Sequence, residues 1–250
     1  MPSRSPPTEP VAVSCPKTAE LLERLHVWAK PLQARPDFRA FNRRKLQVAR
    51  DFYEDEPEGG EGDFEMPAEL SAKYDAVMQF YYLYAACDRL QGMHLYFRRF
   101  PFRDGEMRKV EHLQNMFDLY VNGIYVVEER IKKYLTALKP LVEVEPAVGK
   151  VLKRFGKDFE AELRPRHDST HFRPYNDIIY DRLWMSEVMG MREAGGEGWR
   201  REHDALYRRA TARWAAIVRK RSRDVLVYLE AVAAFTLEHA AFLRPAAEAA

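Results

Sequence analysis

Apolar residues recur every three or four positions along most of the chain, which is the period of an α-helix with one buried face. No stretch alternates apolar and polar positions as a half-buried strand would, and no segment repeats. The pattern therefore predicts an all-α protein, a helical bundle with long antiparallel helices. Its clearest part is one stripe between residues 104 and 139, formed by Met107, Val110, Leu113, Phe117, Tyr120, Ile124, Val127, Ile131 and Leu135.

Clusters of proline and glycine divide this pattern into separate helices. We expect helices over 17–30, 36–53, 67–100, 104–139, 145–163, 176–189 and 199–242. Pro165 is expected to end the fifth of these, because proline interrupts helical hydrogen bonding. At the level of domains, the sequence predicts a disordered leader (1–17), a single all-helical domain (18–243) with an acidic loop (54–66), and a flexible tail (244–250).

The composition places the chain among globular proteins, since 46% of its 250 residues are hydrophobic and 31% are charged. Its formal net charge of +2 does not by itself argue for a nucleic-acid partner. The cysteines, Cys15 and Cys87, fit a reducing cytoplasm, and no apolar run is long enough to predict a membrane span.

Positive charge is concentrated in the first half of the last predicted helix. The simplest interpretation is a solvated face with nearby carboxylate partners, and the functional alternative is a stripe that binds phosphates. Arg208 and Arg209 are the candidate phosphate or RNA contacts within this group. Its members are Arg200, Arg201, Arg208, Arg209, Arg213, Arg219, Lys220, Arg221 and Arg223.

Chemistry-bearing side chains also gather in one short segment, ELRPRHDSTHFRPYND, at residues 162–177. Arg166 and His171 have four residues between them, and His167 follows the arginine directly. A second pair with this spacing, Arg89 and His94, falls inside the predicted helix over 67–100. Side chains five positions apart on a helix differ by about 140° in direction, so that second pair cannot converge.

The Arg166–His171 spacing resembles the Arg-x4–6-His signature of the HEPN superfamily, all-helical proteins of bacterial toxins, defence systems and RNA processing. The resemblance implies that Arg166 and His171, supported by His167, cleave RNA without a metal or cofactor, or that the chain is an RNA-binding relative. It also places Arg164 and Arg173 near the phosphate. A homodimer would bring two copies of the motif into one cleft, and an antitoxin or regulatory protein is a further expected partner.

Two side chains suffice for this chemistry. When the 2′-OH of RNA attacks the adjacent phosphorus, a histidine with a pKa near neutral transfers the proton. A permanently charged, forked arginine can hold the phosphate and stabilise the charge that develops on it.

Two other functions remain open. In the first, the segment is a well-capped corner of a non-enzymatic helical scaffold, in which Arg166 caps helix carbonyls. In the second, the chain is a metal-dependent phosphohydrolase of the HD type, which would use His167–Asp168 or His203–Asp204 as part of its metal site.

Overall fold

Every regular element in the described part of the chain is a helix, which confirms the predicted all-α class. The computed structural model describes residues 14–50, 64–98, 100, 107–169, 178–191 and 196–244, without the side chains of 44–50, 165–169 and 178–180. In chain order the elements are α1 (Pro16–Ala34), α2 (Pro36–Arg50), α3 (Ala68–Met93), the 3₁₀ turn η1 (Tyr96–Arg98), α4 (Lys109–Leu138), η2 (Lys139–Leu141), α5 (Val148–Asp158), α6 (Glu160–Ser169), α7 (Ile178–Gly190), α8 (Gly196–His239) and η3 (Ala241–Leu243).

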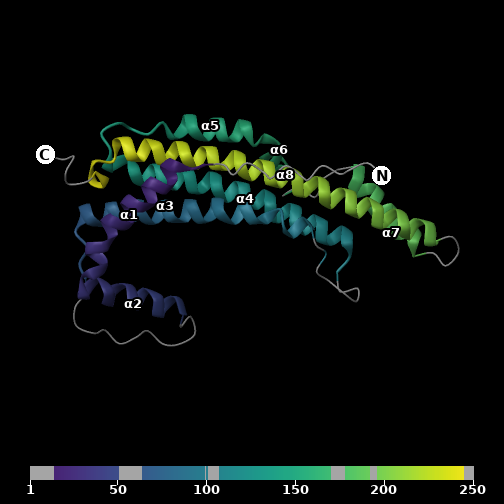
Figure 1. Cartoon of the computed structure of the whole chain (residues 1–250), viewed down its shortest axis with the longest axis horizontal. Helices are drawn as coiled ribbons and strands as arrows, with labels where there is room; N and C mark the ends of the chain where they lie inside the picture. Colours follow the sequence, from purple (N-terminus) through teal and green to yellow (C-terminus); the bar gives the residue numbers. More distant parts are fainter. Residues whose placement is uncertain are drawn as a thin grey trace, which may run out of the picture.

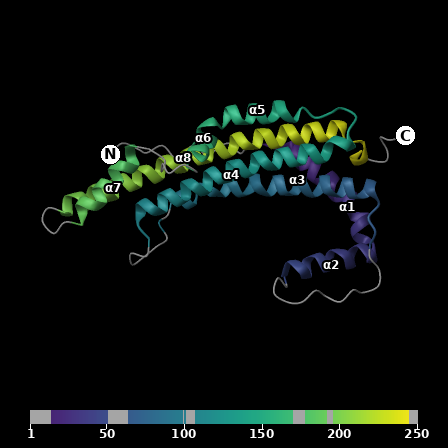
Figure 2. The ribbon, with the colours of Figure 1, turned by 180° about the vertical axis from the view of Figure 1, so that it is seen from behind.

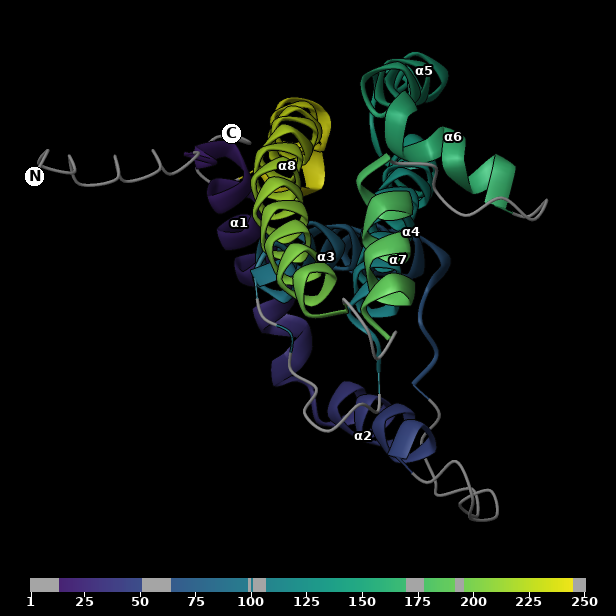
Figure 3. The same cartoon turned by 90° about the vertical axis from the view of Figure 1, so that its right-hand side faces the viewer.

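The molecule is elongated, and α8 runs along most of its length (Figure 1). Figure 2 shows the same arrangement from behind, with α3 and α4 side by side along α8. α5 and α6 pack along α4, while α7 packs against the first part of α8 (Figure 3). None of the described helices is both long and apolar enough to cross a membrane.

The predicted stripe of α4 forms the centre of the core. The stripe residues from Val110 to Leu135 are all buried, and Ile124, Val127 and Ile131 have no surface accessible to solvent. Burying one such side chain contributes about 1.5–3 kcal/mol to folding. Apolar residues of α3, α5 and α8 pack on this stripe, so α4 connects the other helices of the bundle.

A carboxylate of α8 fixes the start of α1. The main-chain N–H groups of Lys17 and Thr18 donate to Glu230 at 2.6 and 2.9 Å, and the Thr18 hydroxyl adds a bond at 2.8 Å. The first N–H groups of a helix have no partner within it, so the Glu230 carboxylate caps α1.

The prediction that Pro165 ends a helix is wrong. The break comes earlier, at Phe159, where φ and ψ are −113° and 22°, and α6 then continues through Pro165 to Ser169. The Phe159 ring is buried and stacks on Phe155 at 4.5 Å between centroids. Core packing of this ring therefore sets the break, while Pro165 removes only one main-chain donor from α6.

Several predicted boundaries also differ from the structure. α1 continues past Pro31 to Ala34, and α8 begins at Gly196 rather than at residue 199. Most of the predicted leader and acidic loop, and the tail from residue 245, lie outside the described residues.

Candidate phosphate-binding site

The structure describes only part of the segment that carries the predicted Arg–His motif. Arg166 and His167 lie in the last turn of α6, but their side chains are outside the description. His171 and Arg173 are also outside the described residues. The convergence of the motif therefore stays a prediction, and within this segment the structure places the side chain of Arg164, which is exposed.

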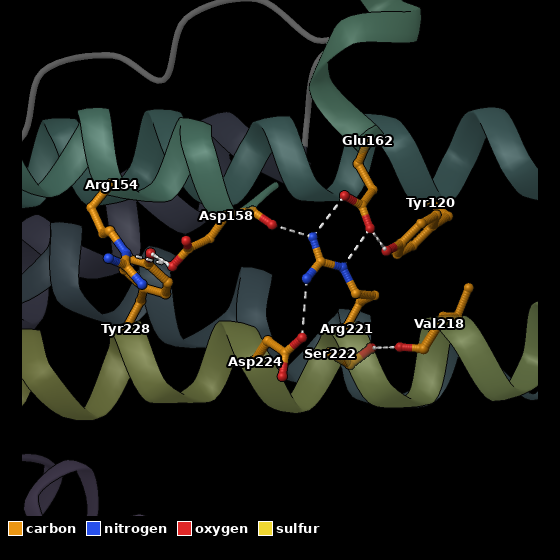
Figure 4. A network of polar contacts seen from close by, with 9 residues as sticks. All are labelled: Tyr120, Arg154, Asp158, Glu162, Val218, Arg221, Ser222, Asp224 and Tyr228. Carbon is orange, nitrogen blue, oxygen red and sulfur yellow. Dashed lines mark hydrogen bonds and ion pairs between the residues drawn. The ribbon is translucent and has the colours of Figure 1, made fainter. Parts of the chain in front are cut away.

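A buried ion pair fixes the first turn of α6 on α8 (Figure 4). Glu162 is 6% exposed, and Arg221 donates to both of its oxygens, from Nε at 2.6 Å and from Nη2 at 2.8 Å. Tyr120 of α4 donates its hydroxyl to the same carboxylate at 2.9 Å. Two-pronged arginine–carboxylate bonding is among the stronger hydrogen-bond geometries, and here it joins three helices.

The rest of the Arg221 guanidinium is also largely bonded. Nη1 donates to Asp224 at 3.1 Å and Nη2 to the main-chain oxygen of Asp158 at 2.5 Å, while the group lies 4.3 Å from the centroid of the Phe159 ring. The pKa of Arg221 is raised, mainly by its hydrogen bonds to Glu162. Because most of its five N–H groups are engaged within the protein, we assign this network a structural role.

Apart from this network, three arginines surround a hollow of about 370 Å³ on the surface of α8. We call this hollow the arginine groove. η1 contributes one of its arginines and α8 contributes the other two. The groove is lined by Arg98, Arg208, Thr211, Ala212, Ala215, Ala216 and Arg219.

The groove follows from the helical period of α8. Positions 208, 212, 215 and 219 are spaced by four, three and four residues, so they share one face of the helix. Alanines between the two arginines leave space that larger side chains would fill. The two arginines are separated by about 16 Å of helix rise, which suits a chain of phosphates better than one small anion.

The arginines of the groove have few partners within the protein. Arg208 donates Nε to the main-chain oxygen of Asp204 at 3.2 Å, and the Asp204 carboxylate pairs with Lys109 at 2.6 Å. In the part of the chain that the structure describes, no carboxylate pairs with Arg98 or Arg219. Their charges are therefore available to an external anion.

His94 lies close to the groove and responds to its charge. Its Nδ1 is 2.8 Å from the main-chain oxygen of Gln91. Burial is the main cause that lowers the pKa of His94, and the positive charges of Arg219, Arg98 and Arg223 lower it further. The imidazole is therefore neutral at pH 7 and lies in a positive field.

The structure corrects the prediction that Arg89 and His94 lie within one helix. α3 ends one residue before His94, which begins the turn to η1. Two hydrogen bonds hold this end of α3 on α8: Ser222 donates Oγ to the Leu90 carbonyl at 2.9 Å, and Gln91 donates Nε2 to the Ser222 carbonyl at 2.7 Å. The positive charges that lower the pKa of His94 belong to Arg98 of η1 and to Arg219 and Arg223 of α8, not to Arg89.

Other arginines of α8 have different surroundings. Arg209 is exposed but does not line the groove, and Arg201 pairs with Glu197 at 2.8 Å. Arg219 and Arg221 are two positions apart and so differ by about 200° in direction. The groove and the buried network therefore lie on opposite sides of α8.

In the predicted pair His203–Asp204, the two side chains bond to different partners. His203 places Nδ1 3.1 Å from a main-chain oxygen of α7, whereas the Asp204 carboxylate pairs with Lys109. No three His, Cys, Asp or Glu side chains gather as metal ligands would, over the residues that the structure describes. The side chains of the other pair, His167 and Asp168, are outside the description.

Comparisons with protein-family models, with curated proteins and with solved structures each gave no match to this chain. A function for this chain is therefore inferred from the arginine groove and from the spacing of Arg166 and His171.

Proposed function

We propose that this chain is a cytoplasmic RNA-binding protein that holds the phosphates of its ligand in the arginine groove. The observation that carries the proposal is the convergence of Arg98, Arg208 and Arg219 from two elements on one hollow. Two of these arginines have no ion-pair partner among the described residues, and their charges add to burial in lowering the pKa of His94. Guanidinium groups bind phosphate oxygens well because their planar donors match the phosphate geometry.

The proposal is tested by measuring RNA binding after removal of two groove charges. We expect the double variant Arg98→Gln, Arg219→Gln to bind a fluorescein-labelled 12-nucleotide RNA at least about tenfold more weakly than the parent, because two phosphate contacts are lost. The matched control is Arg154→Gln, Arg201→Gln, which removes the same net charge from exposed arginines that pair with carboxylates elsewhere. Equal losses in both double variants would mean that only the net charge matters.

We propose as a second activity that the chain cleaves RNA without a metal through Arg166 and His171, with His167 in support, as a HEPN-like bundle of antiparallel helices that forms a homodimer. What favours this proposal is the place of Arg166 in the last turn of a helix whose first turn is fixed by Glu162. A motif at the end of a fixed helix is what the resemblance implies.

The test is RNA cleavage in excess EDTA. The parent is expected to give products that end in 2′,3′-cyclic phosphate, and His171→Ala and Arg166→Ala are expected to abolish them. His26→Ala is the control, because His26 is an exposed residue of α1. Cleavage that persists in both motif variants would assign the activity to another site or to a contaminant. Absence of cleavage in the parent, with RNA binding intact, would leave an RNA-binding protein, and absence of both would favour the scaffold alternative.

A further inference from the structure

η1 is a rigidly held turn at the side of the arginine groove. Its central residue, Phe97, is completely buried and stacks on Trp214 of α8 with 6.3 Å between ring centroids. Hydrogen bonds from the Leu95 N–H to the Gly92 carbonyl at 3.0 Å and from the Arg98 N–H to the Leu95 carbonyl at 3.1 Å close the turn. The two residues on either side of Phe97 are therefore presented from a fixed backbone.

One of these two residues is an unusually exposed aromatic. Tyr96 is 63% exposed, more than any other aromatic side chain that the structure describes, and no described ring packs against it. Leu95 beside it is 55% exposed. Single exposed apolar residues are common on protein surfaces, so what distinguishes Tyr96 is its position next to the arginine groove.

The other residue, Arg98, lines the groove. Tyr96 and Arg98 are two positions apart on a 3₁₀ turn, so they are separated by about 4 Å along its axis and differ by about 120° in direction, which puts the ring beside the groove rather than in its lining. The turn thus combines a ring that can stack on a base with a guanidinium that can hold a phosphate. Proteins that bind single-stranded nucleic acids combine these two features, because only unpaired bases offer free faces for stacking.

We propose that Tyr96 stacks on an unpaired base of the RNA whose phosphates lie in the arginine groove, so that the ligand is single-stranded. This inference rests on the proposed function. It assigns Tyr96 the role of selecting single strands, while the arginines supply attraction that does not depend on sequence or pairing.

The test compares a labelled, non-self-complementary 12-nucleotide RNA with the same RNA annealed to its complement. The parent is expected to bind the single strand at least about fivefold more tightly than the duplex. We expect Tyr96→Ala to lose about tenfold in affinity for the single strand and to lose this preference, while Tyr96→Phe keeps both because its ring still stacks. Tyr84→Ala is the control, since Tyr84 is an exposed tyrosine of α3.

The outcomes separate this inference from the proposed function. If Tyr96→Ala binds the single strand as the parent does while Arg98→Gln, Arg219→Gln does not, the stacking role is overturned and the groove remains a phosphate site. A parent that prefers the duplex would also overturn the inference. If the parent binds neither RNA, both proposals fail.

Discussion

At the scale of single residues, burial of the Glu162 carboxylate depends on Arg221. A charged group loses its hydration when it is buried, and this loss is offset only if hydrogen bonds and an opposite charge replace the water. Here both carboxylate oxygens are bonded by the guanidinium, and Tyr120 adds a neutral donor. Removing one partner of this pair should therefore lower the free energy of unfolding much more than removing one partner of a surface ion pair would.

We expect Arg221→Met to lower the free energy of unfolding by about 3 kcal/mol, because it leaves the Glu162 charge buried with only Tyr120 to bind it. The side chains of the pair are 21% and 8% exposed, so solvent screens their interaction little. Urea unfolding followed by circular dichroism measures the change. Arg154→Gln is the control, since its ion pair with Asp158 involves a side chain that is 70% exposed, and it should cost less than about 1 kcal/mol. Equal effects of the two substitutions would contradict a structural role for the buried pair.

His94 gives a second prediction at this scale, which concerns pH. Its pKa in the free protein lies below the ordinary 6.5 because of burial and the nearby charges of Arg219, Arg98 and Arg223. A bound phosphate would offset those charges and raise the pKa of His94, so binding would take up a proton. RNA affinity should therefore increase as the pH falls from 7.5 to 5.5.

This proton uptake can be measured directly. NMR titration of the imidazole should give a higher pKa for His94 with RNA bound than without it. In His94→Gln the increase in affinity at low pH should be smaller than in the parent. An unchanged pKa on saturation with RNA would place the phosphates away from His94.

At the scale of elements, α3 and α4 approach each other closely at Gly123. A Cβ added there would lie 2.6 Å from Cδ2 of Leu90, which is only 1% exposed. The leucine is enclosed by the core and has little room to move. The absence of a side chain at Gly123 thus permits the close approach of the two helices.

We expect Gly123→Ala to destabilise the protein by about 1 kcal/mol, because the steric conflict outweighs the better helix propensity of alanine. Gly149→Ala is the matched control, since no atom lies within 4 Å of the added Cβ in α5. That substitution should leave stability unchanged or raise it by up to about 1 kcal/mol. Thermal unfolding of both variants decides the question, and a gain in stability for Gly123→Ala would show that Leu90 can move aside.

At the scale of the whole molecule, the sequence pattern predicts the helices but not which side chains meet between them. The stripe of α4 is visible in the sequence because its residues repeat with the period of one helix. The end of α5 is not visible in the sequence, because it depends on the packing of the Phe159 ring in the core rather than on the nearby Pro165. Local signals therefore identify the helices more reliably than the points at which they bend.

The candidate site shows the same limit. Arg208 could be selected from the sequence because it belongs to a dense run of basic residues. Arg98 could not, because it reaches the groove only through the packing of η1 on α8. The alanines at 212, 215 and 216 are the signal that sequence reasoning missed, since small residues between arginines on one helical face leave a hollow. Glu162 and Arg221 likewise meet only in the folded chain.

The central claim is that the groove arginines contact the phosphates of RNA, and the salt dependence of binding tests it most directly. The affinity of the parent for single-stranded RNA should fall with salt concentration on a log–log plot, and the slope should be shallower by about 1.4 in Arg98→Gln, Arg219→Gln, at about 0.7 per lost phosphate contact. The control Arg154→Gln, Arg201→Gln should keep the parental slope. If the groove variant keeps the parental slope as well, the phosphates of the RNA lie elsewhere and the account of the groove is wrong.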